Sequence, residues 1–166
     1  MTLYAESSAV LAWLLGEDAG SGVRDILSRA EMVMASDLTL IECDRVLIRA
    51  VTLGDLLEAD AADRRAHLSS AAASWHVLRI APEIVDRARV RFPAEPIRTL
   101  DALHLASALV ARSAVSGLEI PSLDNRIRTT ARQLGFALQP EHIDPTDNPS
   151  TDDGQLSPTN GPPKAE

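Results

Sequence analysis

The chain has 166 residues, of which 45% are hydrophobic and only 3% are aromatic, so it can bury one sizeable core of mainly aliphatic side chains. The 16 Lys and Arg residues against 24 Asp and Glu residues give a formal net charge of −8, which argues against a protein that coats nucleic acid non-specifically. From Glu141 onward six acids face one lysine, which leaves a net charge of only −3 for residues 1–140, where every base is an arginine.

The first half of the chain alternates short strands with helices. A strand is predicted over Thr2–Glu6, and apolar side chains at helical spacing predict a helix over Ala9–Leu15 that Ser7 or Ser8 caps. The next elements are a helix over 18–30, a strand over Met32–Ala35, a helix from Asp37 or Thr39 to Ala50, and a helix from 54 or 55 to 74.

The second half continues in the same way. Its elements are a strand over Val77–Ile80, a helix over 82–92, a helix over Thr99–Ser113, a strand over Leu118–Leu123, a helix over Asn125–Leu134 and a strand over Phe136–Leu138. Strands that alternate with helices predict an α/β fold, in which helices flank both faces of a parallel central sheet of about four or five strands.

The composition changes near Pro140. Asp, Asn, Pro, Ser, Thr and Gly dominate the rest of the chain, and such a segment buries too little apolar surface to offset its conformational entropy. We therefore predict one domain over residues 1–140 and an acidic, disordered tail over residues 141–166.

The cysteine count and the hydropathy indicate a compartment. Cys43 is the only cysteine, so no disulfide can form within the chain, which fits the reducing cytoplasm. No signal-peptide pattern and no apolar run of roughly 20 residues is present. We expect a soluble cytoplasmic protein with no membrane segment, in which Cys43 is a small buried hydrophobe and Trp13 and Trp75 make core or dimer contacts.

Four acids fall at the ends of the predicted elements. Glu6 ends the first strand, and Glu42 lies near the start of the third helix. Asp101 lies in the first turn of a helix that Thr99 is expected to cap and that is apolar on nearly every side, and Asp124 follows the fourth strand. Because the carboxyl ends of parallel strands share one edge of a sheet, we expect the four carboxylates to converge on one cleft.

A cleft of this kind favours a divalent cation. Carboxylates close together raise each other's pKa, and a cation removes that penalty. Oxygen ligands without His or Cys partners suit Mg²⁺ or Mn²⁺ rather than Zn²⁺. Such a site has the chemistry to cut phosphodiester bonds, because the metal lowers the pKa of a bound water and binds phosphate oxygens.

Each acid also has an interpretation that needs no activity. Glu6 is then an ordinary charge at a strand end, and the helix dipole favours Glu42 and Asp101 near helix starts. Asp124 is then a turn or N-cap residue. His104, one helical turn after Asp101, is interpreted as a packed histidine in preference to an acid–base group.

The chain resembles the PIN domain family, and within it the VapC-type toxin ribonucleases of bacterial toxin–antitoxin pairs. The most specific match is the family's Asp-Ala-Leu-His-Leu-Ala-x-Ala motif at Asp101–Ala108. The other three matches are Leu3–Ala9, Leu40–Glu42, and Ser122–Asp124 followed by an Arg-rich helix and Gly135. Together they cover about residues 1–139.

The resemblance implies a Mg²⁺-dependent endoribonuclease, with Mn²⁺ as a possible substitute, that acts as the toxin of such a pair. It also implies an RNA substrate, a cognate antitoxin and a homodimer. Glu6, Asp101 and Asp124 would then bind the metal, and Glu42 would complete the catalytic set. Ser8 and Ser122 would hydrogen-bond to these acids. Three arginines beside the site would hold the RNA backbone or else form a solvated helix face: Arg126, Arg128 and Arg132.

One departure from the family pattern leaves an alternative open. The family's first acid is Asp, whereas this chain has Glu6, whose carboxylate lies one methylene further from the backbone. Mg²⁺ demands near-ideal octahedral geometry, so the second interpretation is a binding or regulatory module of PIN fold with weakened or lost catalysis. A third, an unrelated phosphatase on an α/β sheet, predicts turnover of small phosphate esters instead of RNA.

Overall fold

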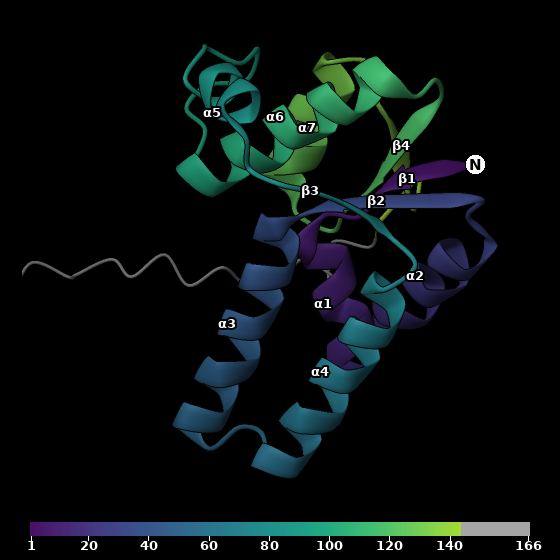
Figure 1. Ribbon diagram of the computed structural model, residues 1–166, viewed down its shortest axis with the longest axis vertical. Coiled ribbons are helices and arrows are strands. Elements are labelled where there is room, and N and C mark those ends of the chain that lie inside the picture. The colour runs from purple at the N-terminus through teal and green to yellow at the C-terminus, as the bar shows by residue number, and fades with distance from the viewer. Residues whose placement is uncertain (144–166) are drawn as a thin grey trace, which may run out of the picture.

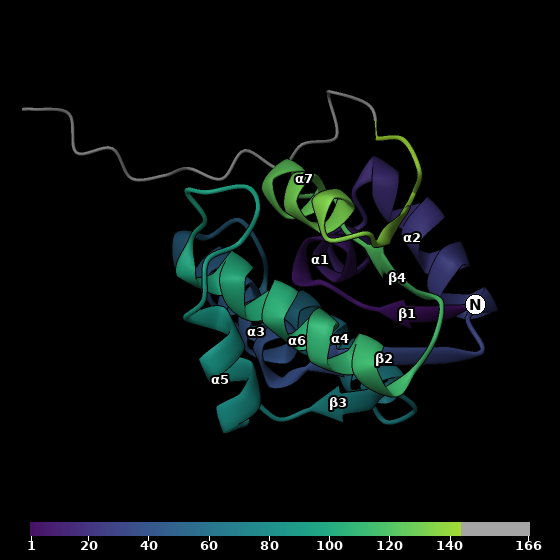
Figure 2. The same cartoon turned by 90° about the horizontal axis from the view of Figure 1, so that it is seen from above.

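A five-stranded sheet lies between two layers of helices in the computed structural model, which describes residues 1–143 (Figures 1 and 2). The strands are β1 (Thr2–Tyr4), β2 (Met32–Ser36), β3 (His76–Leu78), β4 (Leu118–Pro121) and β5 (Ala137–Gln139). Their order in the sheet is β3-β2-β1-β4-β5, and every neighbouring pair is parallel. The predicted parallel α/β fold is confirmed. Most of the tail predicted to be disordered, residues 141–166, lies outside the described residues, which end at 143.

Helices cover both faces of this sheet. They are α1 (Ser7–Leu15), α2 (Asp18–Arg29), α3 (Asp37–Leu53), α4 (Glu58–Ala72), α5 (Pro82–Ala88), α6 (Thr99–Ala114) and α7 (Asn125–Gln133). Figure 1 shows α1 to α4 on one side of the strands and α5 to α7 on the other. Among the described residues, no helix combines the length and the apolar character needed to cross a membrane.

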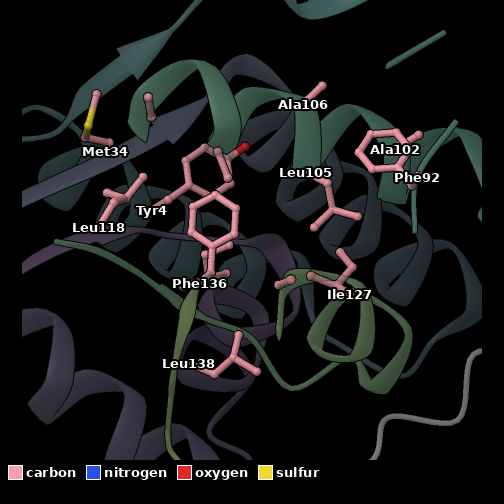
Figure 3. Packing of buried hydrophobic residues seen from close by; sticks show 14 of the residues in the cluster. Tyr4, Met34, Phe92, Ala102, Leu105, Ala106, Leu118, Ile127, Phe136 and Leu138 are labelled. Carbon is pink, nitrogen blue, oxygen red and sulfur yellow. The ribbon is translucent and has the colours of Figure 1, made fainter. Parts of the chain in front are cut away.

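Alternation along the strands divides the core into two clusters. In β2, Val33 and Ala35 face the cluster under α1 to α4, whereas Met34 faces the cluster under α5 to α7. Figure 3 shows the second cluster, which includes Tyr4, Leu105 and Phe136. Partly buried residues also pack on the first cluster, among them Trp13 and Trp75, which confirms their expected place in the core.

Several element ends differ from the sequence prediction. The first strand ends at Tyr4, and Glu6, rather than Ser7 or Ser8, is the N-cap of α1. Two further helices begin after residues that were not predicted as caps: Ser36 precedes α3 and Arg98 precedes α6. Neither of these two side chains makes a capping hydrogen bond, so sequence preferences for caps had no signal to detect there.

The residue that follows β1, Ala5, is fixed both to β2 and to the start of α3. The Thr39 hydroxyl in α3 donates to the Ala5 carbonyl at 3.0 Å, and the Ala5 amide donates to the Met34 carbonyl at 2.7 Å. These bonds hold the starts of α1 and α3 beside the same edge of the sheet, where α6 and α7 also begin.

Candidate active site

The four acids singled out in the sequence line one cleft of about 520 Å³ at the carboxyl edge of the sheet. Glu6 precedes α1, Glu42 lies in the second turn of α3, Asp101 is in the first turn of α6, and Asp124 caps α7. Glu6 and Asp101 are buried, whereas Glu42 and Asp124 are partly exposed. The topology therefore brings the four carboxylates together as expected, and their catalytic role stays a prediction.

Glu6 is held by the first turn of α1. Its Oε1 accepts hydrogen bonds from the Ser7 hydroxyl at 2.9 Å and from the Ser8 amide at 3.0 Å, and its Oε2 accepts from the Ser8 hydroxyl. The longer side chain of Glu, relative to the family's Asp, is thus folded back onto its own helix start. This places the carboxylate as an N-cap as well as in the cleft.

Ser8 connects the first acid to the fourth. Besides donating to Glu6, its hydroxyl accepts from the Leu123 amide at 2.8 Å and from the Asp124 amide at 3.2 Å. The Ser122 hydroxyl accepts from the same Asp124 amide at 3.2 Å and lies 3.3 Å from the Ser8 hydroxyl. The two serines therefore hold the loop before α7 against α1, in keeping with their predicted supporting position.

His104 makes polar contacts in addition to the packing role favoured from the sequence. It is buried, as expected, but its Nε2 lies 2.6 Å from Glu42 Oε2, 3.2 Å from the Ser7 hydroxyl and 3.9 Å from Glu6 Oε1. Its Nδ1 lies 3.3 Å from the Tyr4 hydroxyl. Sequence reasoning missed this link, because the partner of His104 lies 62 residues away.

The contact between His104 and Glu42 shifts the pKa of both side chains. Burial opposes protonation of His104, but the hydrogen bond to Glu42 and the charges of Glu6 and Glu42 outweigh it and raise the pKa of His104. Burial likewise opposes ionisation of Glu42, yet the hydrogen bonds from His104 and Ser7 leave the pKa of Glu42 below its usual value. The two groups thus favour each other's charged forms.

We expect this pair to make stability depend on pH in metal-free protein. The contribution of Glu42 is present above its reference pKa of 4.5 and is lost as pH falls through its lowered pKa. That of His104 is complete below its reference pKa of 6.5 and is lost as pH rises through its raised pKa. Denaturant unfolding of Glu42→Gln should show a deficit of about 1.5–3 kcal/mol near pH 5–6 that shrinks at higher pH.

Glu58→Gln is the control for this experiment, since Glu58 is exposed and its ion pair with Arg65 is long, at 3.9 Å. A deficit for Glu42→Gln that stays constant from pH 5 to pH 9 would contradict the assignment of the pair.

Arg98 joins the other two acids and was missed in the sequence. Its Nε and Nη2 donate to Asp101 Oδ2 and Oδ1 at 3.0 and 3.3 Å, and its Nη2 also donates to Asp124 Oδ2 at 3.0 Å. Burial raises the pKa of Asp101, and the bonds from Arg98 offset only part of this. The available signal was the spacing, because residues three apart at a helix start face each other.

The expectation that Arg128 contacts RNA is wrong. Its side chain is only 1% exposed, and its guanidinium donates to the carbonyls of Ser122, Pro140 and Glu141 at 2.7, 2.8 and 3.0 Å. The helical periodicity of α7 turns this arginine inward, whereas Arg126 and Arg132 are exposed. Sequence reasoning also missed Arg45, an exposed residue of α3 that lines the cleft.

The donor set fits a hard divalent cation in kind, because four carboxylates surround the cleft and the His104 Nε2 faces Glu42. The arrangement of these side chains in the structure is less suited to a cation than their chemistry is. Within residues 1–143, no group of three or more His, Cys, Asp or Glu side chains is assembled so that it could hold a metal. The guanidinium of Arg98 lies between Asp101 and Asp124 instead.

This fold, with carboxylates from four elements at one edge, matches a known family. The sequence profile of the PIN domain matches residues 3–133. The chain belongs to the PIN domain family, and it is similar to relatives named Ribonuclease VapC, as the resemblance in sequence indicated.

Individual relatives also resemble this chain, in sequence or in fold. "Ribonuclease VapC46" from Mycobacterium tuberculosis is 30% identical over 136 residues, which cover 82% of this chain and 95% of the relative. The crystal structure of M. tuberculosis VapC20, described as a "Sarcin-Ricin loop cleaving toxin", superposes with a TM-score of 0.58 at 16% identity. The superposition covers 86% of this chain and 99% of the VapC20 chain. A "Toxin-antitoxin complex from Klebsiella pneumoniae" contains a chain that superposes with a TM-score of 0.52 at 15% identity, covering 75% of this chain and 87% of that one.

Proposed function

We propose that this protein is an endoribonuclease that depends on Mg²⁺ or Mn²⁺ and serves as the toxin of a toxin–antitoxin pair. The observation that carries the proposal is the convergence of Glu6, Glu42, Asp101 and Asp124 on one cleft. The name of the ribonuclease that is 30% identical supports the reaction class, and the action of VapC20 on the sarcin–ricin loop supports a structured RNA as the substrate.

The proposed ligands are Glu6, Asp101 and Asp124, and a bound cation would supply an activated water and contacts to phosphate oxygens. The chain's own residues have separate tasks. Ser8 holds Glu6 and the Asp124 loop together, so the two acids keep a fixed separation. Glu42, fixed by His104 and aimed into the cleft, orients the attacking water.

The RNA backbone is proposed to lie along the exposed face of α7, where Arg126 near the start of the helix and Arg132 in its last turn carry positive charge. A cognate antitoxin is the proposed protein partner, supported by the toxin–antitoxin complex from K. pneumoniae. A homodimer and a cytoplasmic location remain part of the proposal, the latter because an RNA substrate and a free Cys43 suit that compartment.

The test is cleavage of total RNA and of a sarcin–ricin stem-loop by the purified chain, freed of antitoxin, with Mg²⁺, with Mn²⁺ and with chelator. We expect cutting that needs the metal and stops with the chelator. Metal-dependent turnover of p-nitrophenyl phosphate without RNA cleavage would instead favour a phosphatase.

Glu6→Asp decides between the nuclease and the binding module. Shortening the side chain restores the family's first acid while leaving Ser7 and Ser8 in place. We expect the native protein to cut RNA and Glu6→Asp to change the rate by less than about tenfold, because Glu6 already faces the cleft. No cleavage by the native chain together with activity in Glu6→Asp would show a PIN fold whose site has lost its reaction.

A further inference from the structure

The contacts of Arg98 resemble those that a bound cation would make. The guanidinium is bidentate on Asp101 and reaches Asp124 with the same Nη2, so one positive group bonds to both carboxylates. The two acid side chains are 7% and 15% exposed, whereas that of Arg98 is 39% exposed. The arginine therefore reaches inward from the rim of the cleft to acids that water can scarcely solvate.

Two nearly buried carboxylates that face one another need a positive counter-charge to stay ionised together. Arg98 supplies this charge in the structure, through both oxygens of Asp101 and one of Asp124. A divalent cation held by Asp101 and Asp124 would need the same two carboxylates, and like charges would repel a guanidinium that stayed in place.

We propose that Arg98 is an internal counter-ion that a divalent cation must displace, so that Arg98 and the metal occupy the site alternately. The inference rests on the proposed metal-dependent function. The displaced side chain needs no unfolding, because Arg98 stands at the start of α6 and is already partly open to solvent. The apparent metal affinity is then lowered by the fraction of molecules in which Arg98 closes the site.

Direct measurement of Mn²⁺ binding to metal-free protein, by electron paramagnetic resonance of the free ion, tests the proposal without reference to activity. Arg98→Gln removes the charge and keeps most of the side-chain length. Arg45→Gln is the matched control, because Arg45 lines the same cleft without a hydrogen bond or ion pair to Asp101 or Asp124 among the described residues. We expect Arg98→Gln to bind Mn²⁺ about tenfold or more tightly than the native protein, and Arg45→Gln to bind within about threefold of it.

A thermal measurement gives a second readout that a merely structural arginine would not move. Without metal, Arg98→Gln should melt below the native protein, because Asp101 and Asp124 lose their counter-charge. With saturating Mn²⁺ this gap should close or reverse, since the ion replaces the guanidinium. A gap that persists unchanged would mean that Arg98 only stabilises the fold and would overturn the proposal.

The outcomes separate this inference from the proposed function. Equal Mn²⁺ affinity of the native protein and Arg98→Gln overturns the alternation and leaves a metal-dependent nuclease possible. Tighter binding by Arg98→Gln with no RNA cleavage by any variant supports the alternation and overturns the nuclease. Absence of Mn²⁺ binding by every variant overturns both.

Discussion

Asp101→Asn is expected to slow metal-dependent RNA cleavage by about a hundredfold or more, the scale on which loss of one group that stabilises developing charge slows an enzyme. Asn keeps the shape of the side chain in the first turn of α6 but cannot carry the negative charge that a cation requires. The measurement is the initial rate of cleavage of a labelled RNA at saturating Mg²⁺, for native and variant protein.

Loss of folding would not explain this result. Burial raises the pKa of Asp101, so the ionised carboxylate is costly in the folded state and a neutral amide removes that cost. The thermal midpoint of Asp101→Asn in chelator should lie close to that of the native protein. Asp25→Asn is the control, because Asp25 is exposed on α2 and pairs only at 3.6 Å with Arg29. A rate within threefold of the native value would exclude Asp101 as a ligand or catalytic group.

Arg128→Ala is expected to lower the free energy of unfolding by about 3–5 kcal/mol, because the truncation leaves buried carbonyl groups without their donor and opens a cavity. Three carbonyl groups lose their donor, and the large side chain leaves a cavity under α7. The bonds also join α7 to the loop after β4 and to the segment after β5, so the substitution removes contacts among three parts of the chain. Urea unfolding followed by circular dichroism measures the change.

Arg132→Ala provides the comparison on the same helix, because Arg132 is exposed and its truncation is expected to change stability by no more than about 0.5 kcal/mol. If both variants unfold at the same urea concentration, Arg128 does not contribute the stability that its contacts indicate. If Arg128→Ala is destabilised but binds RNA normally when folded, the correction to its predicted role is supported.

The fold was accessible from the sequence because its signals are local. The short apolar run of β2 and the glycine that stops α7, Gly135 at φ 81, are signals of this kind, because a left-handed backbone position favours one residue type. Element ends were less accessible. The N-cap of α1 is Glu6, a residue outside the usual capping set, and its choice depends on the serines that follow it.

Some residues of the candidate site could also be predicted from the sequence, and others could not. The acids could be found because parallel topology puts strand ends on one edge, so order along the chain was enough. The bonds of Arg98 to Asp124 and of His104 to Glu42 could not be found, since they join residues 26 and 62 positions apart. Arg128 shows the converse error, because a row of arginines in the sequence does not tell which of them the helix turns inward.

The order of the acids along the chain has a consequence for synthesis. Glu6 and Glu42 are made before β3, whereas Asp101 and Asp124 follow it, and Asp124 comes only after β4, the strand that pairs with β1. An amino-terminal fragment that ends anywhere before residue 124 therefore lacks at least one of the four carboxylates. A ribosome that stalls or terminates early on this message therefore releases a chain that cannot assemble the complete cleft.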